Sequence, residues 1–256
     1  MDDNTTYITK VDERSLYGDG IGKVELWDFS RANQNEESRI EAVAAVASVC
    51  YGKPAKDHAK LVEMLKTESN GGMSSAFEFV RWGYALRMDQ SLRNRPEALF
   101  NRAWDDEIIE HKARIATFRL KVPIFVARQV MRHRSFSYQE LSRRYTDNEC
   151  APFQFWAPRQ EYKQAYNYAI TQFMALTRDG VPLEQARAVL GTGLYTEFWM
   201  QGDILAWKNY FALRLDQHTQ KEHREVAEAM LAMLCLHQPE LYAEVVPGCL
   251  CSKTDV

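Results

Sequence analysis

Residues 122–145 read VPIFVARQVMRHRSFSYQELSRRY, and this stretch decides how the rest of the chain is interpreted. Pro123 suits a first helical turn, because its missing N–H has no partner there. The apolar run at 124–131 predicts a buried helix, on which Gln129, Arg132 and His133 share one face at spacings i, i+3 and i+4. Residues 136–145 change to aromatic, hydroxyl and charged side chains, so a basic cluster is expected where the helix passes into a loop or strand.

The basic cluster points to an anion site. A solvated face is the usual explanation of a charge run, but here guanidinium groups recur together with hydroxyl, amide and carboxylate groups. A planar guanidinium grips a phosphate or a carbonyl edge at two points. The whole chain has a formal net charge of -3. Because the positive charge is local, a small anionic ligand fits better than a polyanion.

Composition describes an ordinary soluble globular protein, with 256 residues, 46% hydrophobic and 26% charged side chains. The five cysteines form no C-x-x-C pair, so we expect free thiols in a reducing cytosol and no metal site. The N-terminus is polar and acidic, unlike a secretory signal, and no window approaches eighteen apolar residues. We therefore expect a cytoplasmic protein that does not enter a membrane.

Hydrophobic periodicity predicts strands at 7–11, 23–29 and 113–122, and helices at 37–51, 58–67, 161–177 and from 182 onward. Residues 195–237 are expected to be mostly helical, with an interruption near Gly202. Arg187 stands among small apolar residues, where a guanidinium is costly unless it meets an anion. Arg214, His218 and Glu222 follow each other at i, i+4 steps and predict a ladder on one helix face, which a structural salt-bridged stripe also explains.

A family resemblance emerges from the central motif. Arg132-His133-Arg134, then seven residues and Ser142, resembles the signature of flavin-dependent thymidylate synthases, and Gln129, Glu140, Arg144 and Tyr145 accompany it. The likeness continues through residues 186–187, 194–196 and 209–222 and weakens toward both ends. It implies an α+β fold, with a small, twisted, largely antiparallel sheet packed with many helices. A single domain over 1–256 would carry a probable insertion at 81–110.

The resemblance also implies an activity. Such an enzyme converts dUMP to dTMP by reductive methylation, with methylenetetrahydrofolate as carbon donor, NADPH as electron source and FAD as hydride carrier. No cysteine nucleophile is needed, and the Pro-Cys-His type motif of the cysteine-dependent synthase is absent. Family members are homotetramers whose active sites are shared between subunits.

Site residues follow from the same resemblance. The nucleotide-binding residues would be Gln129, Arg132, Glu140, Leu141, Ser142, Arg143, Arg144, Arg187 and Arg214. The FAD-binding residues would be Ser75, Glu78, Arg132, His133, Arg134, Glu140, Asn209 and His218. Arg214 would be catalytic, facing the uracil and favouring its ionised form, and Arg143 would act through its backbone. Cys50 would touch the flavin or simply pack at a helix end.

Two other functions remain open at this point. A related flavoenzyme could install a different one-carbon group on dUMP, because Met73 and Phe79 stand where the family often has histidines near the folate. A nucleic-acid-binding protein could use the arginine-rich motifs and the basic segment at 81–110, although we expect no nucleic-acid partner.

Overall fold

The computed structural model describes residues 7–32, 34–67, 74–80, 115–144, 146–147, 149 and 151–239. Its centre is a five-stranded sheet in which every neighbouring pair is antiparallel. The strand order is β1 (Thr9–Ser15), β2 (Lys23–Asp28), β3 (Ile115–Pro123), β5 (Tyr195–Asp203) and β4 (Ser137–Glu140). The predicted α+β fold with an antiparallel sheet is therefore confirmed.

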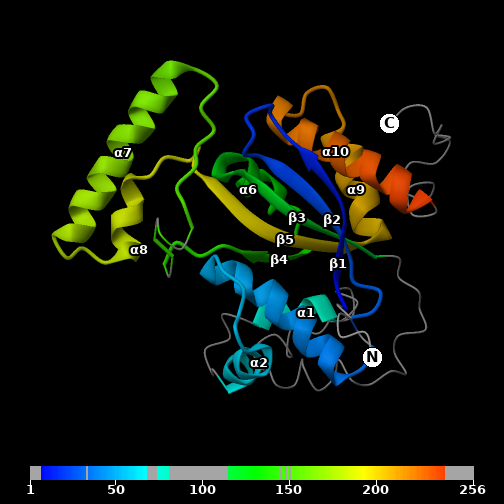
Figure 1. Cartoon of the computed structure of the whole chain (residues 1–256). Coiled ribbons are helices and arrows are strands. Elements are labelled where there is room, and N and C mark those ends of the chain that lie inside the picture. Colours follow the sequence, from blue (N-terminus) through cyan, green and yellow to red (C-terminus); the bar gives the residue numbers. More distant parts are fainter. Residues whose placement is uncertain are drawn as a thin grey trace.

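Helices cover both faces of the sheet (Figure 1). Side chains alternate along a strand, so Phe118, Leu120 and Val122 of β3 enter one core while Arg119 and Lys121 face the other side. The first core is completed by α6 (Ile124–Val130), α9 (Ile204–Arg214) and α10 (Lys221–His237). The second core is closed by α1 (Glu36–Ser48), η1 (Val49–Tyr51), α2 (His58–Thr67) and η2 (Ser74–Val80).

The sequence explains how β3 passes directly into α6. Pro123 has an extended backbone, with φ −60° and ψ 147°, and serves as the N-cap of the helix. Val126 and Val130 are fully buried and belong to the same core cluster as Trp207 of α9. The helix therefore packs into the first core, and the polar residues that follow it lead into β4.

Residues 195–203 correct the sequence prediction, because they form β5 rather than helix. The stretch YTEFWMQGD alternates with a period of two, which places Phe198 and Met200 in the first core and Trp199 in the second. Gly202 sits where a Cβ would lie 2.4 Å from the ring of Phe136, so close packing excludes a side chain there. The strand ends at Asp203, whose carboxylate accepts a hydrogen bond from Ala206 N and caps α9.

The predicted ladder of Arg214, His218 and Glu222 is also wrong. Arg214 is the last residue of α9, His218 lies in the loop that follows, and Glu222 is in the first turn of α10. The three side chains therefore do not share one helix face. Their spacing of four residues does not align them, because α9 ends at Arg214.

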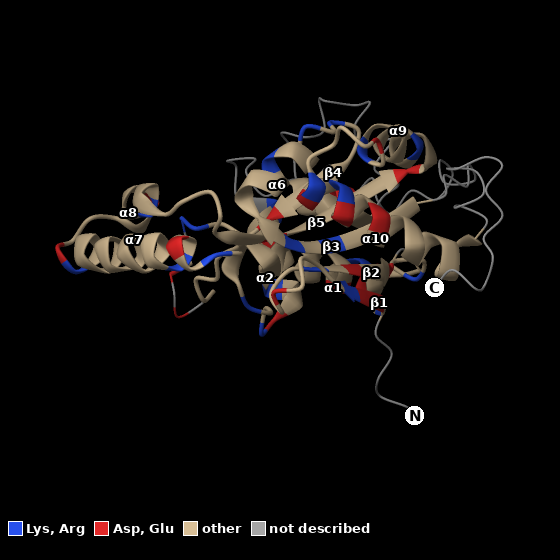
Figure 2. Ribbon diagram, turned by 90° about the horizontal axis from the view of Figure 1, so that it is seen from above, with Lys and Arg blue, Asp and Glu red and all other residues tan. Residues whose placement is uncertain are grey.

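A helical arm projects from the sheet (Figures 1 and 2). It consists of α7 (Gln160–Arg178), which confirms the predicted helix, together with α8 (Leu183–Ala186) and η4 (Arg187–Val189). Ala186 is buried, whereas Arg187 is exposed rather than enclosed by apolar residues. The arm returns to the sheet through Leu194 and β5.

Three sequence predictions concern other parts of the chain. The insertion predicted at 81–110 lies outside the described residues. Cys50 is a free, buried thiol, whereas Cys235 is disulfide-bonded, so the prediction of free thiols is wrong for Cys235. Among the helices of the described ranges, none has the length and apolar character needed to span a bilayer.

Candidate active site

Helix α6 presents two different polar environments on two of its faces. Ile124, Ala127, Arg128 and Met131 line a cavity of about 450 Å³. Gln129 points elsewhere and contacts residues that follow α9. The periodicity of 3.6 residues separates these faces, so neighbouring residues of one short helix serve two sites.

The cavity brings together four residues that the family resemblance singles out. Glu140 ends β4, Leu141 and Arg143 follow it, and Arg187 begins η4, 44 residues beyond Arg143 in sequence. Arg128 of α6 contributes a further guanidinium group to the same wall. Two exposed arginines, Arg128 and Arg187, and one carboxylate therefore line one hollow, which is an arrangement suited to an anion that also offers hydroxyl groups.

The carboxyl group of Glu140 is poised between opposing effects. Desolvation raises its pKa above the ordinary value, whereas a hydrogen bond from Thr196 and the charges of Arg128 and Arg187 lower it. The Thr196 hydroxyl donates to Glu140 Oε1 at 2.7 Å. Since β4 pairs with β5 next to this point, the sheet itself fixes the carboxylate at the cavity wall.

Backbone hydrogen bonds anchor the segment that follows Glu140. Leu141 N donates to Glu197 O at 2.8 Å, and Ser142 N donates to Cys50 O at 3.2 Å. Arg144 Nε contacts Glu184 Oε2 at 3.3 Å, and Arg187 Nε donates to the backbone oxygen of the same glutamate at 3.2 Å. The loop is thus tied both to the sheet and to the helical arm.

Arg143 directs its side chain into the loop it belongs to. Its Nη1 donates to the carbonyl oxygens of Asp147 and Ala151, and its guanidinium lies 4.8 Å from the ring centroid of Phe153. Burial lowers the pKa of Arg143 to about 10, so the group remains cationic at neutral pH. The side chain therefore closes the loop around the cavity.

A second polar group lies on the other side of α6 and centres on two histidines. Arg214 Nε donates to His133 Nε2 at 2.8 Å, and the His133 ring packs edge-on against Tyr210 with centroids 4.9 Å apart. Tyr210 Oη lies 3.2 Å from His223 Nε2, and His223 Nδ1 lies 3.4 Å from Gln129 Oε1. The predicted residues Gln129, His133 and Arg214 are therefore brought together.

Both histidines are neutral at physiological pH. Desolvation, followed by the charge of Arg214, lowers the pKa of His133 to about 4. Desolvation, Arg214 and His133 together lower the pKa of His223 to about 3. Sequence reasoning missed Tyr210 and His223, because nothing in the sequence distinguishes them from ordinary buried residues of α9 and α10.

A third group of predicted residues lies on the opposite face of the sheet. Glu78 of η2 accepts a 2.7 Å hydrogen bond from Ser137 Oγ, and Ser75 donates to the side chain of Gln139. Glu78 is buried, with 7% of its surface exposed. The remaining predicted residues have exposed side chains, namely Arg132, Arg134, Asn209 and His218.

Cys50 is a packed cysteine in this structure. Its thiol contacts the backbone oxygen of Glu140 at 3.0 Å, and Gln139 Nε2 donates to its sulfur at 2.7 Å. Burial raises the pKa of Cys50 to about 11. The thiol is therefore protonated at neutral pH and is unsuited to nucleophilic attack.

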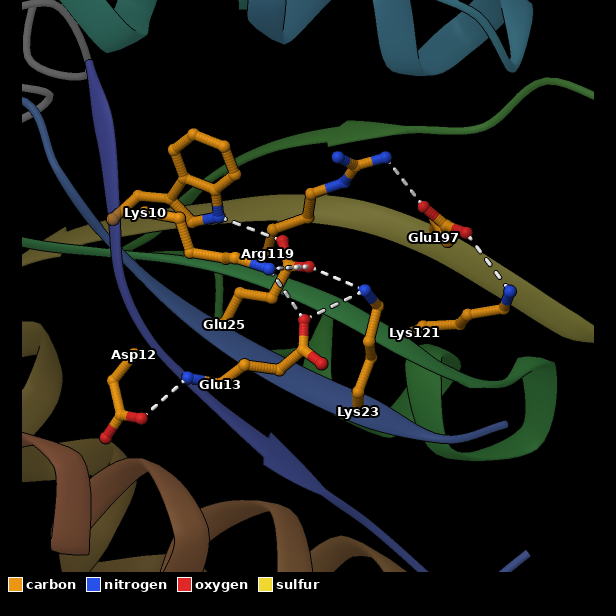
Figure 3. Close-up of polar contacts among 9 residues, drawn as sticks. Lys10, Asp12, Glu13, Lys23, Glu25, Arg119, Lys121 and Glu197 are labelled. Atoms are coloured by element: carbon orange, nitrogen blue, oxygen red, sulfur yellow. Dashed lines mark hydrogen bonds and ion pairs between the residues drawn. The ribbon is translucent and has the colours of Figure 1, made fainter. Parts of the chain in front are cut away.

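A further cavity, of about 320 Å³, lies on the α1 side of the sheet and is lined in part by Arg119, Lys121, Glu197 and Trp199. Three of its charged residues, Arg119, Lys121 and Glu197, are paired with one another (Figure 3). Glu197 bonds Arg119 Nη2 at 2.8 Å and Lys121 Nζ at 3.4 Å. A neighbouring network joins the carboxylates of β1 and β2 to lysines, including Lys23 and Glu25 at 2.7 Å. These ion pairs join neighbouring strands on the α1 side of the sheet, and we assign this cavity no ligand.

The fold and the first cavity define the class of protein: an α+β protein with an arginine-lined cavity beside a central antiparallel sheet. The chain belongs to the thymidylate synthase complementing protein family, whose model matches residues 34–240. The resemblance found in the central motif is thereby confirmed.

Curated relatives carry informative names. The chain is 32% identical over 163 residues to a flavin-dependent thymidylate synthase of Synechocystis sp., covering 54% of this chain and 71% of the relative. It is 35% identical over 131 residues to a protein of the same name from Thermotoga neapolitana, covering 45% and 59%. It is 28% identical over 205 residues to a probable flavin-dependent thymidylate synthase of Paramecium bursaria Chlorella virus 1, covering 67% and 90%.

Proposed function

We propose that this protein is a flavin-dependent thymidylate synthase that reductively methylates dUMP to dTMP. Methylenetetrahydrofolate would supply the carbon, NADPH the electrons, and FAD would carry the hydride. Family membership and the names of the relatives support this activity. The observation that carries the proposal is the cavity in which Glu140, Leu141, Arg143 and Arg187 meet.

The cavity suits the 5′-phosphate side of dUMP. The guanidinium groups of Arg128 and Arg187 are exposed, so a ligand can reach them. The charges of both arginines also lower the pKa of Glu140. A phosphate dianion gains most from such charge-assisted hydrogen bonds. Glu140 accepts hydrogen bonds, so it is matched to a hydroxyl or N–H of the nucleotide rather than to its phosphate.

Arg214 is the proposed catalytic residue, and its hydrogen-bond partner is important for that role. His133 is neutral, so it orients the guanidinium without cancelling its charge. A carboxylate in the same place would neutralise the arginine. An arginine held by a neutral imidazole keeps its full positive charge for the uracil ring, where negative charge develops as the pyrimidine is activated.

FAD would be held by the exposed residues Arg132, Arg134, Asn209 and His218, together with His133, Glu140, Ser75 and Glu78. This donor set fits the cofactor, because guanidinium groups bind a diphosphate and the amide and imidazole groups can bond a polar ring edge. When bound, FAD supplies the hydride that reduces the transferred carbon. The chain's own residues orient the nucleotide and hold its charge.

We further propose that the protein is a homotetramer with shared active sites. The predicted nucleotide-binding residues divide into two groups on different sides of α6. The cavity group contains Glu140 and Arg187. The interior group contains Gln129 and Arg214, which are half-exposed but bonded to the buried histidines. A second copy that brings its interior group against the first copy's cavity would complete the site. A single domain over 1–256 and a cytoplasmic location are part of the same proposal.

The activity is tested by the colour and product of the purified protein. The proposal expects an absorbance spectrum of oxidised flavin that NADPH or dithionite bleaches, and a nucleotide product whose mass exceeds that of dUMP by one methylene. Another mass increment would indicate a related enzyme that transfers a different one-carbon group. A colourless protein that binds nucleic acid with a steep salt dependence would overturn the proposal.

Shared sites are tested by mixing two impaired variants, Arg187→Ala and Arg214→Ala, and measuring dTMP formation at a dUMP concentration far below the raised KM of Arg187→Ala. If each site takes one residue from each of two copies, subunit exchange creates some sites with both arginines intact. Statistical mixing predicts recovery of about a quarter of the wild-type activity. If both arginines come from one copy, every site keeps a defect and the mixture shows only the average of the two variants' low activities.

A further inference from the structure

A row of side chains runs from Tyr210 of α9 through His223 of α10 to Gln129 of α6 and ends at Glu222. Tyr210 Oη lies 3.2 Å from His223 Nε2, and His223 Nδ1 lies 3.4 Å from Gln129 Oε1. Gln129 Nε2 donates to Gln220 Oε1 at 2.5 Å, and Gln220 Nε2 donates to Glu222 Oε2 at 2.9 Å. Tyr210 and His223 are fully buried, whereas Gln129 reaches partly exposed space.

The direction of this row is set at its Glu222 end. A carboxylate only accepts hydrogen bonds, so Gln220 must turn its amide nitrogen toward Glu222 and its oxygen toward Gln129. Gln129 must then present its nitrogen to Gln220 and its oxygen to His223. Each amide orientation is fixed by the group before it.

The same logic fixes the proton on His223. To satisfy Gln129 Oε1, the imidazole must carry its proton on Nδ1, which leaves Nε2 as an acceptor for Tyr210. Burial raises the pKa of Tyr210, so its hydroxyl keeps the proton that it donates. The row therefore runs without a break from a phenol donor to a carboxylate acceptor.

We propose that His223 is a positioning residue that locks the amide of Gln129 in one orientation for the nucleotide. This inference rests on the proposed function, in which Gln129 contacts dUMP. The terminal torsion of a glutamine is broad and roughly two-fold, so an unsupported amide exchanges its oxygen and nitrogen ends. With His223 and Gln220 engaged, Gln129 keeps one free oxygen lone pair and one free N–H in known positions.

His223 lies behind Gln129 and does not itself belong to the predicted set of ligand contacts. It touches Tyr210 and Gln129, and its ring centroid lies 6.4 Å from that of His133, the partner of Arg214. The fixed amide presents a donor and an acceptor side by side. A nucleotide that offers the complementary pair binds more tightly than one that offers two donors or two acceptors.

Two amide replacements of His223 separate an effect on the orientation of Gln129 from an effect on folding stability. In His223→Asn the side-chain amide nitrogen occupies the place of Nδ1 and can still donate to Gln129. In His223→Gln the amide lies near the place of Nε2, so it keeps contact with Tyr210 but cannot reach Gln129. Both variants exchange a buried imidazole for a neutral amide, so their thermal midpoints are expected to fall by similar amounts.

Steady-state kinetics with dUMP then show whether the bond from residue 223 to Gln129 affects nucleotide binding. His223→Asn is expected to keep a KM within about twofold of wild type, whereas His223→Gln raises KM about three- to tenfold, the size of one neutral hydrogen bond. The kcat values of both should stay within about twofold of each other. Equal KM values for the two variants at equal stability would overturn the inference.

The proton position provides a test that does not require a folded variant. Nitrogen-15 NMR of histidine-labelled wild-type protein should find two buried histidines, His133 and His223, in the neutral Nδ1-protonated form, because each has an Nε2 that accepts a hydrogen bond. Neither should titrate between about pH 5 and about pH 8. An Nε2-protonated His223 would overturn the inference. Wild-type protein that neither binds nor converts dUMP would instead overturn the proposed function.

Discussion

The two polar sides of α6 differ in how their charges are satisfied. On the cavity side, Arg128 and Arg187 are exposed, and Arg187 Nε donates to the backbone oxygen of Glu184. On the interior side, Arg214 is bonded to His133, and Gln129 lies between His223 and Gln220. Exposed charges can exchange water for a ligand at little cost, whereas polar groups that are bonded to fixed neighbours hold an orientation. One side therefore suits binding and the other suits positioning.

The largest effect on activity is expected for Arg214→Ala, which tests the interior side of α6. We expect kcat to fall by at least about 100-fold, because the guanidinium that stabilises developing charge is lost. Arg224→Ala is the matched control, since Arg224 lies nearby in sequence and its guanidinium bonds Gln217 O and Glu228. Steady-state rates of dTMP formation measure both. Retained activity in Arg214→Ala would remove its catalytic role and make the interior group purely structural.

Arg187→Ala tests the cavity side and should act on binding. Losing one charge-assisted contact to phosphate is expected to raise KM for dUMP about 10- to 100-fold, with little change in thermal stability because the side chain is exposed. Arg178→Ala provides the control, because Arg178 is exposed on the same arm and pairs only weakly with Asp179 at 3.8 Å. An unchanged KM would show that the cavity does not hold the phosphate.

Acid should destabilise the interior side. The pKa values of His133 and His223 are lowered in the folded state to about 4 and about 3, so the unfolded chain binds more protons in the window below its ordinary histidine pKa of about 6.5. Stability is then complete above that value and is lost as pH falls toward 4, with a slope of about 1.4 kcal/mol per pH unit for each histidine.

Denaturant unfolding between pH 4 and pH 8 measures this slope. The groups that face the two imidazoles are Arg214, Tyr210 and Gln129, and Arg214 remains charged throughout. His223→Asn removes one titrating group and should reduce the slope by about half. A slope unaffected by this replacement would mean that other groups control acid stability.

The smallest effect is expected for Cys50→Ser, which tests whether Cys50 only packs against its neighbours or also contacts the flavin. The buried thiol bonds Glu140 O and Gln139, and its raised pKa of about 11 makes it a poor nucleophile. We expect dTMP formation within about twofold of wild type and a loss of stability of about 1 kcal/mol. Iodoacetamide should leave Cys50 unmodified in the folded protein. Loss of bound flavin in Cys50→Ser would restore the alternative that it contacts the cofactor.

Local patterns predicted most of the elements correctly. The helices at 58–67 and 161–177 and the strand at 113–122 appear in the structure with shifts of a few residues at their ends. The strand at 195–203 was missed because a helix, α9, follows it directly and its alternation is short. Its place between β3 and β4 depends on long-range pairing, such as Phe118 with Met200, which no local pattern reveals.

The sequence by itself determined the family motif, the local concentration of arginine and the two-fold alternation that gives β3 its opposite faces. Tertiary structure alone decided that Arg187 joins Glu140 at one cavity, that Arg214 meets a neutral His133, and that Tyr210 and His223 stand behind Gln129. The physical reason is that charge and periodicity are local properties of the chain. Hydrogen-bond partners and desolvation depend on which distant segments the packed core brings together.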